Sequence, residues 1–552
     1  MIEPNVRRGV RLRKIVGVEE ALAGVDDGSV VAVSGFNNAL TPEYLLLKLY
    51  EMWERTGHPR KLFLESDSLP GVRGRGLDLV AGKLLERGEQ DFISGVLMPF
   101  FGFAPNLMRL AMGGSIEVYS WSVGVVAYWF REVASGRPGL ITKVGLRTFF
   151  DPRSEGGCAN DLARERRRCR IRVIDLDGDE YLFYSAPKPN VSLIRGTTAD
   201  GMGNLTMERE GMVGTVLAMA QASKAAPNPG MVIAQVEETV PFGALHPQMI
   251  QVPGPLIDRI VVSPPEHHWQ GGTIRFDPRV CGAAPFRGEE VPLKLTPEKV
   301  VARRVALELV RVAAAARRPL LINLGVGIPA MVSSVIHEEG LGEVMIPTIE
   351  SGAWGGIALS DEDFGLSMGP FAIISMPDQF SVYEGGMLDA TSLGFMQVDA
   401  EGNVNPSVLP DRFTGPGGFP VIAAGSPRIY FAGAFTAGRR DVRVEDGRLF
   451  IERDGPIRKF VSHVYKVMFS GATALRNGRD VLYVTERAVL RLTNDGLTLE
   501  EYAPGVDIDR DVLGAMEFRP SVSPKVAPMD PRLFHEETMG LREDLASSGL
   551  LD

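Results

Sequence analysis

Residues 320–335 read LLINLGVGIPAMVSSV, and residues 30–46 read VVAVSGFNNALTPEYLL. Each stretch joins an apolar run, which is typical of a buried strand, to a glycine-containing loop and then to a helix that begins near a proline. Short β-branched runs alternate with helical patterns along the whole chain, which predicts an α/β fold with mostly parallel sheets. We expect strands at 29–33, 231–236 and 320–324, and helices at about 211–224, 298–316 and 329–339.

The two stretches are followed by further similarities in the same order. A strand ending in Glu-Ser comes next, at residues 65–66 and 350–351, and an Asp-x-x-Gly-Asn sequence follows at 200–204 and 399–403. Between these last two marks the first copy carries about 86 more residues than the second. Chance similarity of generic α/β segments is the alternative. Three shared features in the same order (the strand-loop-helix stretch, the Glu-Ser strand end and the Asp-x-x-Gly-Asn sequence) nevertheless predict an internal duplication. A protein built from two copies normally places its site where the copies face each other.

The middle of the chain contains the predicted boundary between the copies. Residues 282–297, GAAPFRGEEVPLKLTP, are rich in glycine, proline and charge, as linkers are. We therefore expect an N-terminal domain over residues 1–285, a linker over 286–297 and a C-terminal domain over 298–552. Asn204 and Asn403 end the repeated Asp-x-x-Gly-Asn sequence and are interpreted as turn residues.

Composition excludes several classes of protein. The 552 residues carry a formal net charge of −10 and are 45% hydrophobic, an ordinary balance for a globular protein. The negative charge disfavours nucleic acid as a partner. No apolar run reaches the ~20 residues that cross a bilayer, so no membrane association is expected. One segment is strongly basic and comprises arginines 164, 166, 167, 168 and 170. We interpret this arginine cluster as a solvated helix end or loop, and the alternative is contact with an anionic ligand or a partner subunit.

Cysteines and histidines give no metal-site pattern. Cys158, Cys169 and Cys281 lack metal-type spacing and form no disulfide framework, which fits a reducing cytoplasm. The adjacent His267 and His268 resemble a ligand pair, but neighbouring residues on a strand point to opposite faces. A role in packing or in a turn is therefore favoured for both.

One acidic residue stands in a setting that suits chemistry. Glu350 lies in TIESGAWGG (348–356) directly after an apolar strand, and open α/β sheets place their ligands at the carboxyl ends of strands. The glycines around it leave a carboxylate in space free of side chains, which an ordinary structural glutamate does not need. The matching Glu65 is followed by Ser66 and Asp67 instead of glycines, so we expect Glu65 to be inert.

Glycine loops on either side of Glu350 could hold a ligand. Gly325 and Gly327 join a strand to a helix start, whose free N–H groups can bind phosphate or carboxylate. The sequence GVGIPA also fits the dinucleotide pattern, with Glu343 where a ribose-binding acid would lie, although such a loop is often only a tight turn. Downstream, YEGGMLD (383–389) and TGPGGF (414–419) suit backbone N–H groups aimed at a developing oxyanion. Gln379 offers a side-chain amide donor, with a hydrogen-bonded turn as its alternative role.

Taken in order, these motifs resemble the family I CoA-transferases, and the resemblance covers nearly the whole chain. The single-chain branch that acts on acetate, propionate and short-chain acyl-CoAs is the most similar. The first half contributes APKPNVSLIRGTTADGMGNLTME at 186–208. The second half contributes GVGIP (325–329), IESGAWGG (349–356), QFSVYEGGMLD (379–389), LGFMQVDAEGNVNPS (393–407), GPGGF (415–419) and FAGAFTAG (431–438).

The resemblance implies two similar open α/β/α domains of the CoA-transferase type and a homodimer or homotetramer. It implies that Glu350 is the nucleophile, that Gln379 is a side-chain oxyanion donor, and that the backbone near Gly417 and Gly418 supplies the other donor. We assign CoA binding to five glycines of the same loops: Gly325, Gly327, Gly352, Gly385 and Gly386. Two departures from the family pattern, Ser381 and Met387, leave the acyl preference open.

The reaction implied is transfer of CoA from a short-chain acyl-CoA to an acid of the acetate or propionate type. It would follow ping-pong kinetics through an acyl-glutamyl anhydride and a glutamyl-CoA thioester, with CoA as a substrate and no metal or other cofactor. Three alternatives stay open: an acyl-CoA thioesterase at the same site, a nicotinamide-dependent oxidoreductase built on GVGIPA, and a non-catalytic acyl-CoA sensor.

Overall fold

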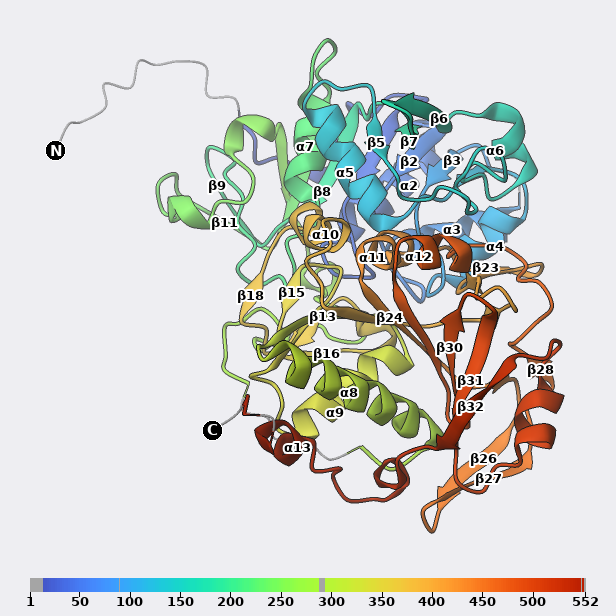
Figure 1. The fold of residues 1–552 in the computed structure, drawn as a ribbon. Coiled ribbons are helices and arrows are strands. Elements are labelled where there is room, and N and C mark those ends of the chain that lie inside the picture. Colours follow the sequence, from blue (N-terminus) through green and yellow to red (C-terminus); the bar gives the residue numbers. More distant parts are fainter. Residues whose placement is uncertain (1–12, 89, 287–292, 548, 551–552) are drawn as a thin grey trace.

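The computed structural model describes residues 13–88, 90–286, 293–547 and 549–550 (Figure 1). The N-terminal half is built on a seven-stranded sheet in which every pairing is parallel. Its strands are buried on both faces, because helices cover them. In spatial order they are β12 (Arg259–Val262), β10 (Met231–Val236), β8 (Val191–Arg195), β1 (Val30–Val33), β2 (Leu62–Glu65), β3 (Ile93–Leu97) and β4 (Glu117–Tyr119).

The helices of this half pack as two groups. One group contains α1 (Val18–Leu22), α2 (Glu43–Thr56), α3 (Gly76–Arg87) and α4 (Pro105–Met112). The other pairs α5 (Val123–Ala134) with α7 (Val216–Lys224). A small antiparallel sheet of β5 (Leu140–Thr142), β7 (Asp179–Ser185) and β6 (Arg170–Leu176) is inserted before β8, together with α6 (Asp161–Arg166).

The C-terminal half is built on a ten-stranded mixed sheet. Its centre, from β14 to β29, is parallel, and β15, β18, β30 and β31 pair antiparallel. In order the strands are β18 (Ala372–Ile373), β15 (Ala353–Trp354), β14 (Met345–Thr348), β13 (Leu320–Leu324), β19 (Ala390–Leu393), β24 (Arg428–Ala432), β29 (Asp480–Val484), β30 (Ala488–Thr493), β31 (Gly496–Tyr502) and β32 (Ser521–Pro528). Its helices are α8 (Pro297–Ala316), α9 (Ile328–Glu338), α10 (Met376–Glu384), α11 (Phe419–Gly425), α12 (Gly471–Arg476) and α13 (Leu541–Ser547).

The two halves share a topological centre. The order β8-β1-β2 in the first sheet matches β19-β13-β14 in the second, and all of these pairs are parallel. The additional residues of the first copy form β3 to β7 with their helices. After β8 and β19, Asp200 and Asp399 accept hydrogen bonds from the backbone of Asn204 and Asn403, at 3.0 Å each. The turn roles of both asparagines are confirmed, and the shared order is what a duplicated fold predicts.

Most predicted elements are confirmed, with small corrections. The strands at 231–236 and 320–324 have the predicted bounds, and the predicted helix at 211–224 begins only at Val216, because 211–215 form a loop and turn. His267 ends a 3-10 turn (Pro265–His267) that His268 follows, which fits the predicted turn role, and the His268 Nε2 atom is hydrogen-bonded to Glu210 Oε1 at 3.2 Å. Residues 287–292 of the predicted linker lie outside the described part of the chain, so the domain boundaries stay predictions.

The predicted arginine cluster lies at the end of α6 and the start of β6. Arg164 pairs with Glu155 and Asp161, and Arg168 pairs with Glu117 at 2.8 Å. These contacts fit the structural interpretation of the cluster. Of the helices described, none is long and apolar enough to cross a membrane.

Candidate active site

Glu350 lies two residues beyond β14, at the carboxyl edge of the second sheet. A tight turn places it there: the Gly352 N–H donates to Ile349 O at 2.9 Å, and the Ile349 N–H donates to Ala353 O at 3.0 Å. The Ser351 hydroxyl donates to Gly365 O, which anchors the turn to the neighbouring loop. The Glu350 side chain is only 8% exposed, so one carboxylate is held out of water at a strand end.

Burial changes the ionisation of this carboxylate. Loss of solvation raises the pKa of Glu350 from 4.5 to about 7, and a hydrogen bond from the Gly418 backbone opposes the rise. In the described part of the chain no Lys, Arg or His forms an ion pair with Glu350. A carboxylate that is buried without a cation is costly to keep for stability alone, which is typical of a functional site.

The loop that carries Gly418 is fixed by the N-terminal half. The Gly417 N–H donates to Pro99 O at 3.0 Å, and Gly417 O accepts hydrogen bonds from the Val123 N–H at 2.9 Å and the Ser122 hydroxyl at 3.0 Å. A Cβ at Gly418 would overlap the Oε2 atom of Glu350, so only glycine allows this approach. The backbone donor and the carboxylate are thus brought together by both halves of the chain.

A cavity of about 360 Å³ opens beside Glu350, between the two halves. Four of the predicted glycines line it: Gly325, Gly327, Gly417 and Gly418. The C-terminal half also contributes residues of the 323–327 loop, of the 393–396 segment and of the 414–419 loop. The N-terminal half contributes Phe36, Asn37, Ser68, Phe100, Gly102, Phe103 and Val123.

Gln379 lies on α10 and is fully buried. Its Oε1 accepts a hydrogen bond from the indole N–H of Trp354 at 2.6 Å, and since the indole can only donate, the amide is held with its Nε2 turned away. Nε2 has no hydrogen-bond partner among the described residues. Burial raises the pKa of the Tyr383 hydroxyl; the charge of Glu350 adds to this rise and the Gln379 side chain opposes it. Gln379 and Glu350 thus both lie within electrostatic reach of the Tyr383 hydroxyl, and the Gln379 amide keeps an unpaired donor there.

Three of the glycines predicted to bind CoA do not line the cavity. Gly352, at φ +109°, is needed for close approach to the Ile374 carbonyl. Gly385 and Gly386 end α10 and are exposed, and their sequence forms a helix end instead of the predicted loop at a strand end. CoA binding by these three glycines therefore stays a prediction; what the structure shows of them is a role in backbone packing for Gly352 and a helix end for Gly385 and Gly386.

Sequence reasoning missed the N-terminal wall of the cavity. Phe100, Phe103 and Val123 lie in apolar runs with no motif, and no signal in the sequence distinguishes them from core residues. It also missed Asn323, whose amide donates to Tyr383 Oη at 3.0 Å and to Thr348 O at 3.2 Å. These two hydrogen bonds of Asn323 fix the end of β14, two residues before Glu350.

The counterpart of Glu350 in the first half has a different environment. Glu65 ends β2, is fully buried, and neither of its oxygens has a hydrogen-bond partner among the described residues. Burial raises its pKa well above the ordinary range, and the charge of Arg168 opposes this. Glu65 does not line the Glu350 cavity. Its predicted inertness stays a prediction.

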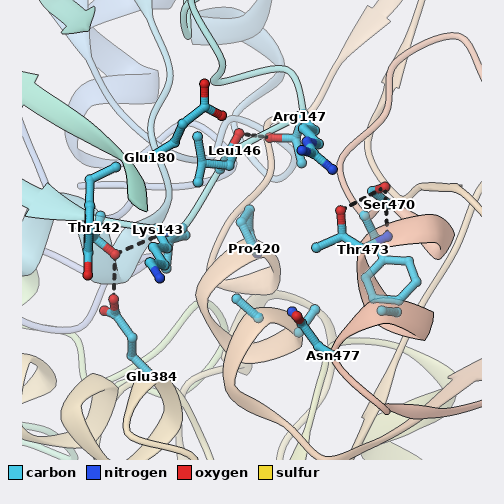
Figure 2. A pocket seen from close by; sticks show the side chains of 18 of the residues that line it. Thr142, Lys143, Leu146, Arg147, Glu180, Glu384, Pro420, Ser470, Thr473 and Asn477 are labelled. Carbon is cyan, nitrogen blue, oxygen red and sulfur yellow. Dashed lines mark hydrogen bonds between the residues drawn. The ribbon is translucent and has the colours of Figure 1, made fainter. Parts of the chain in front are cut away.

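A larger cavity, of about 790 Å³, lies on the other side of α11 and does not include Glu350 (Figure 2). Pro420 and Ala423 of α11 line this cavity, whereas Phe419 and Ile422 line the one beside Glu350. Figure 2 shows Thr142 of the N-terminal half hydrogen-bonded to Glu384 at one side of it. Size alone therefore does not identify the candidate site, because the buried carboxylate lies in the smaller cavity.

A buried carboxylate with a backbone donor, at the boundary of two similar α/β halves, agrees with the comparisons to known proteins. Residues 16–263 match the family model described as Coenzyme A transferase. The caffeate CoA-transferase of Acetobacterium woodii is 38% identical over 538 residues, which is 96% of this chain and 99% of that protein. The chain therefore belongs to the coenzyme A transferase family, and it is an enzyme that transfers CoA between an acyl-CoA and a carboxylic acid.

Other CoA-transferases are similar to this chain over nearly its whole length. The acetate CoA-transferase YdiF of Escherichia coli K12 is 35% identical, covering 95% of this chain and 96% of its own. The solved apoenzyme of acyl-CoA transferase YdiF from E. coli O157:H7 has a TM-score of 0.87 at 34% identity, covering 97% of this chain and 98% of that one. A second structure of the same enzyme, described as a thioester complex with CoA, has a TM-score of 0.86.

Proposed function

We propose that the enzyme transfers CoA from a short-chain acyl-CoA to an acid of the acetate or propionate type, with Glu350 as a covalent nucleophile. One observation carries this proposal. The Glu350 carboxylate is buried, has no cationic partner among the described residues, and meets the Gly418 N–H at the end of a cavity that is open to a ligand. The thioester complex described for the E. coli relative supports the same chemistry.

The proposed reaction consists of two acyl exchanges at carbonyl carbons, followed by their reversal with the second acid. The ionised carboxylate attacks the thioester carbonyl, the CoA thiolate leaves, and an acyl-glutamyl anhydride forms. The thiolate attacks the glutamyl carbonyl, which releases the first acid as its carboxylate and leaves glutamyl-CoA. The acceptor carboxylate then reverses these two steps and takes CoA away, which gives ping-pong kinetics.

The described groups have distinct roles in this scheme. Gly418 N–H and Gln379 Nε2 would donate to the oxyanion that develops on the carbonyl under attack, where a pre-positioned donor is most effective. The low polarity that raises the pKa of Glu350 also makes its anion a better nucleophile and keeps water from the anhydride. Binding energy from the CoA arm can offset the cost of desolvating the carboxylate. We propose that the loop with Gly325 and Gly327, which lines the cavity, binds that arm.

Trapping the intermediate tests the proposal. Incubation with an acyl-CoA followed by borohydride or hydroxylamine should modify Glu350, as read by mass spectrometry, and Glu350→Ala should abolish transfer. Modification of another residue, or transfer that survives in Glu350→Ala, would overturn the assignment. Release of free CoA without any acceptor acid, at the rate of transfer, would identify a thioesterase instead.

We further propose that the enzyme uses no metal or redox cofactor and that it works as a cytoplasmic homodimer or homotetramer. The chemistry supports the first part, since each step is an exchange at a carbonyl with no change in oxidation state. Transfer should be unchanged after dialysis against EDTA, and light scattering should give a mass two or four times that of the 60.0 kDa chain. A monomer with full activity would contradict the oligomer.

A further inference from the structure

One side of the cavity beside Glu350 belongs to the N-terminal half. The loop that presents Gly418 to Glu350 lies between two segments of that half, since Gly417 bonds to Pro99 on one side and to Val123 on the other. A Cβ at Gly415 would overlap Pro99 and come within 3.1 Å of the Phe100 Cα. Phe100 and Val123 therefore contact the 415–418 loop that carries the proposed oxyanion donor.

Most of this side is apolar, and we call its four large apolar residues the aromatic wall, after the three phenylalanines: Phe36, Phe100, Phe103 and Val123. Asn37, Ser68 and Gly102 complete the same side of the cavity. The rings of Phe100 and Phe103 meet edge to face at 5.3 Å, and Phe36 packs against Phe364 of the opposite side at 6.2 Å. Phe36 and Val123 are buried, while Phe100 and Phe103 are half-buried and so keep open surface. Of the residues that the N-terminal half contributes to the cavity, none carries a charge.

Charges in the cavity are few, and none of them is carried by this wall. Apart from Glu350, the charged lining residues in the described part of the chain are Asp361 and Arg412. Both are exposed and come from the C-terminal half. A second carboxylate on an acyl group held at this wall would therefore meet aromatic rings, whose faces are negative, and the one cation of the described cavity lining, Arg412, is an exposed side chain of the other half.

We infer that the aromatic wall receives the acyl group, and that the acid which sets specificity is an apolar monocarboxylic acid larger than propionate, either a longer alkyl chain or an aromatic ring. This inference rests on the proposed function. Acetate or propionate then serves as the small second acid, because donor and acceptor use the same site in turn. Dicarboxylic acyl groups are disfavoured by the same wall.

The aromatic wall makes the preference measurable in the intact enzyme. Values of kcat/KM with acetate as acceptor should rise by about tenfold or more from acetyl-CoA or propionyl-CoA to hexanoyl-CoA or cinnamoyl-CoA, since a single methylene in an apolar pocket contributes on that scale. Succinyl-CoA should be the poorest of the series. A decline from acetyl-CoA upward, or equal use of succinyl-CoA, would overturn the inference while leaving the proposed function intact.

Variants locate the acyl group. Phe103→Ala should lower the ratio of kcat/KM for hexanoyl-CoA to that for acetyl-CoA by about tenfold, and Phe103→Leu should restore most of it. A rise in this ratio would contradict the inference, because Phe103 would then exclude larger acyl groups instead of favouring them. The control is Phe242→Ala, whose ring is 66% exposed and outside the cavity.

Two results separate the hypotheses. Ratios that stay at the wild-type value in both Phe100→Ala and Phe103→Ala, with folded protein, would show that the wall does not contact the acyl group. Absence of transfer from every acyl-CoA, or transfer that survives Glu350→Ala, would instead overturn the proposed function on which the inference rests.

Discussion

Glu350 combines two properties that a structural carboxylate rarely has together. It is buried without a cationic partner in the described part of the chain, and it receives a backbone hydrogen bond from a glycine on another loop. Burial raises its pKa to about 7, so near neutral pH both the acid and the anion are populated. Only the anion can attack a thioester, and its fraction therefore sets the rate of the first step.

The pH profile of transfer should report this ionisation. Because the anion is the reactive form, kcat/KM should rise with pH through a midpoint near 7 and then level off, with about a tenfold loss for each pH step below the midpoint. Initial rates between pH 5 and 9 would measure it. A profile that is flat down to pH 5 would mean that Glu350 keeps the ordinary pKa of a glutamate.

The same shift predicts that Glu350 lowers stability. Between pH 4.5 and about 7 the unfolded chain loses the proton that the folded state keeps, so the folded state becomes less stable as pH rises. Glu350→Gln should therefore raise the free energy of unfolding by up to about 3 kcal/mol at pH 8 and change it little at pH 5. Calorimetry at both pH values would check this, and equal effects at the two would contradict it.

At the scale of elements, the site depends on two short helices of the C-terminal half. Helix α11 begins directly after Gly418, and α10 carries Gln379. Both helices contact α5 of the N-terminal half. The proposed donors Gly418 and Gln379 are therefore packed together with Val123 of the aromatic wall, which begins α5. In Figure 1 these helices lie between the two sheets.

Gly418→Ala should strongly lower the rate of transfer. The added Cβ would overlap the Glu350 carboxylate and would meet Phe380 as well, so either the carboxylate or the loop must move, and in both cases the hydrogen bond from the Gly418 N–H to Glu350 is disturbed. A loss of about 10²-fold or more in kcat is expected, as for removal of an oxyanion donor. Gly342→Ala is the matched control, since its Cβ would meet nothing within 4 Å. Activity within a few-fold of wild type in Gly418→Ala would contradict this geometry.

Gln379→Leu tests the second donor. Removal of the free Nε2 should lower kcat by about 10²- to 10³-fold with a smaller change in KM. Trp354→Phe keeps the amide but removes the indole that orients it, so a smaller loss is expected there. Equal kcat in wild type and Gln379→Leu would leave the Gly418 backbone as the principal donor.

At the scale of the whole molecule, the cavity exists only where the halves meet. Ligand that binds the folded enzyme there should stabilise it by mass action, by about 2.7 kcal/mol at a concentration of 100 times Kd. CoA should therefore raise the melting temperature, and NADH should not, because no nicotinamide chemistry is expected at this site. Thermal scans with each ligand would decide. A shift with NADH alone would favour the oxidoreductase interpretation of the Gly325–Gly327 loop.

The fold was predictable because local patterns carry it. Apolar runs of the right length predicted β10 and β13 to the residue, and the three repeated marks predicted the shared order of the two sheets. The helix at 211–224 was predicted five residues too long, because its first residues are held as a turn by tertiary contacts that no helical period reveals. The local conformation at Gly385 and Gly386 was misjudged for a similar reason, since a glycine pair ends a helix as readily as it makes a loop.

The sequence by itself determined which carboxylate stands out, because strand-end position and surrounding glycines are local properties of residues 345–356. Only the tertiary structure decided what surrounds that carboxylate. The pKa of Glu350, the overlap that makes Gly418 irreplaceable, and the aromatic wall all arise from segments that are about 70 to 310 residues apart in the chain. Desolvation and close packing depend on distance in space, and neither can be read from a local pattern.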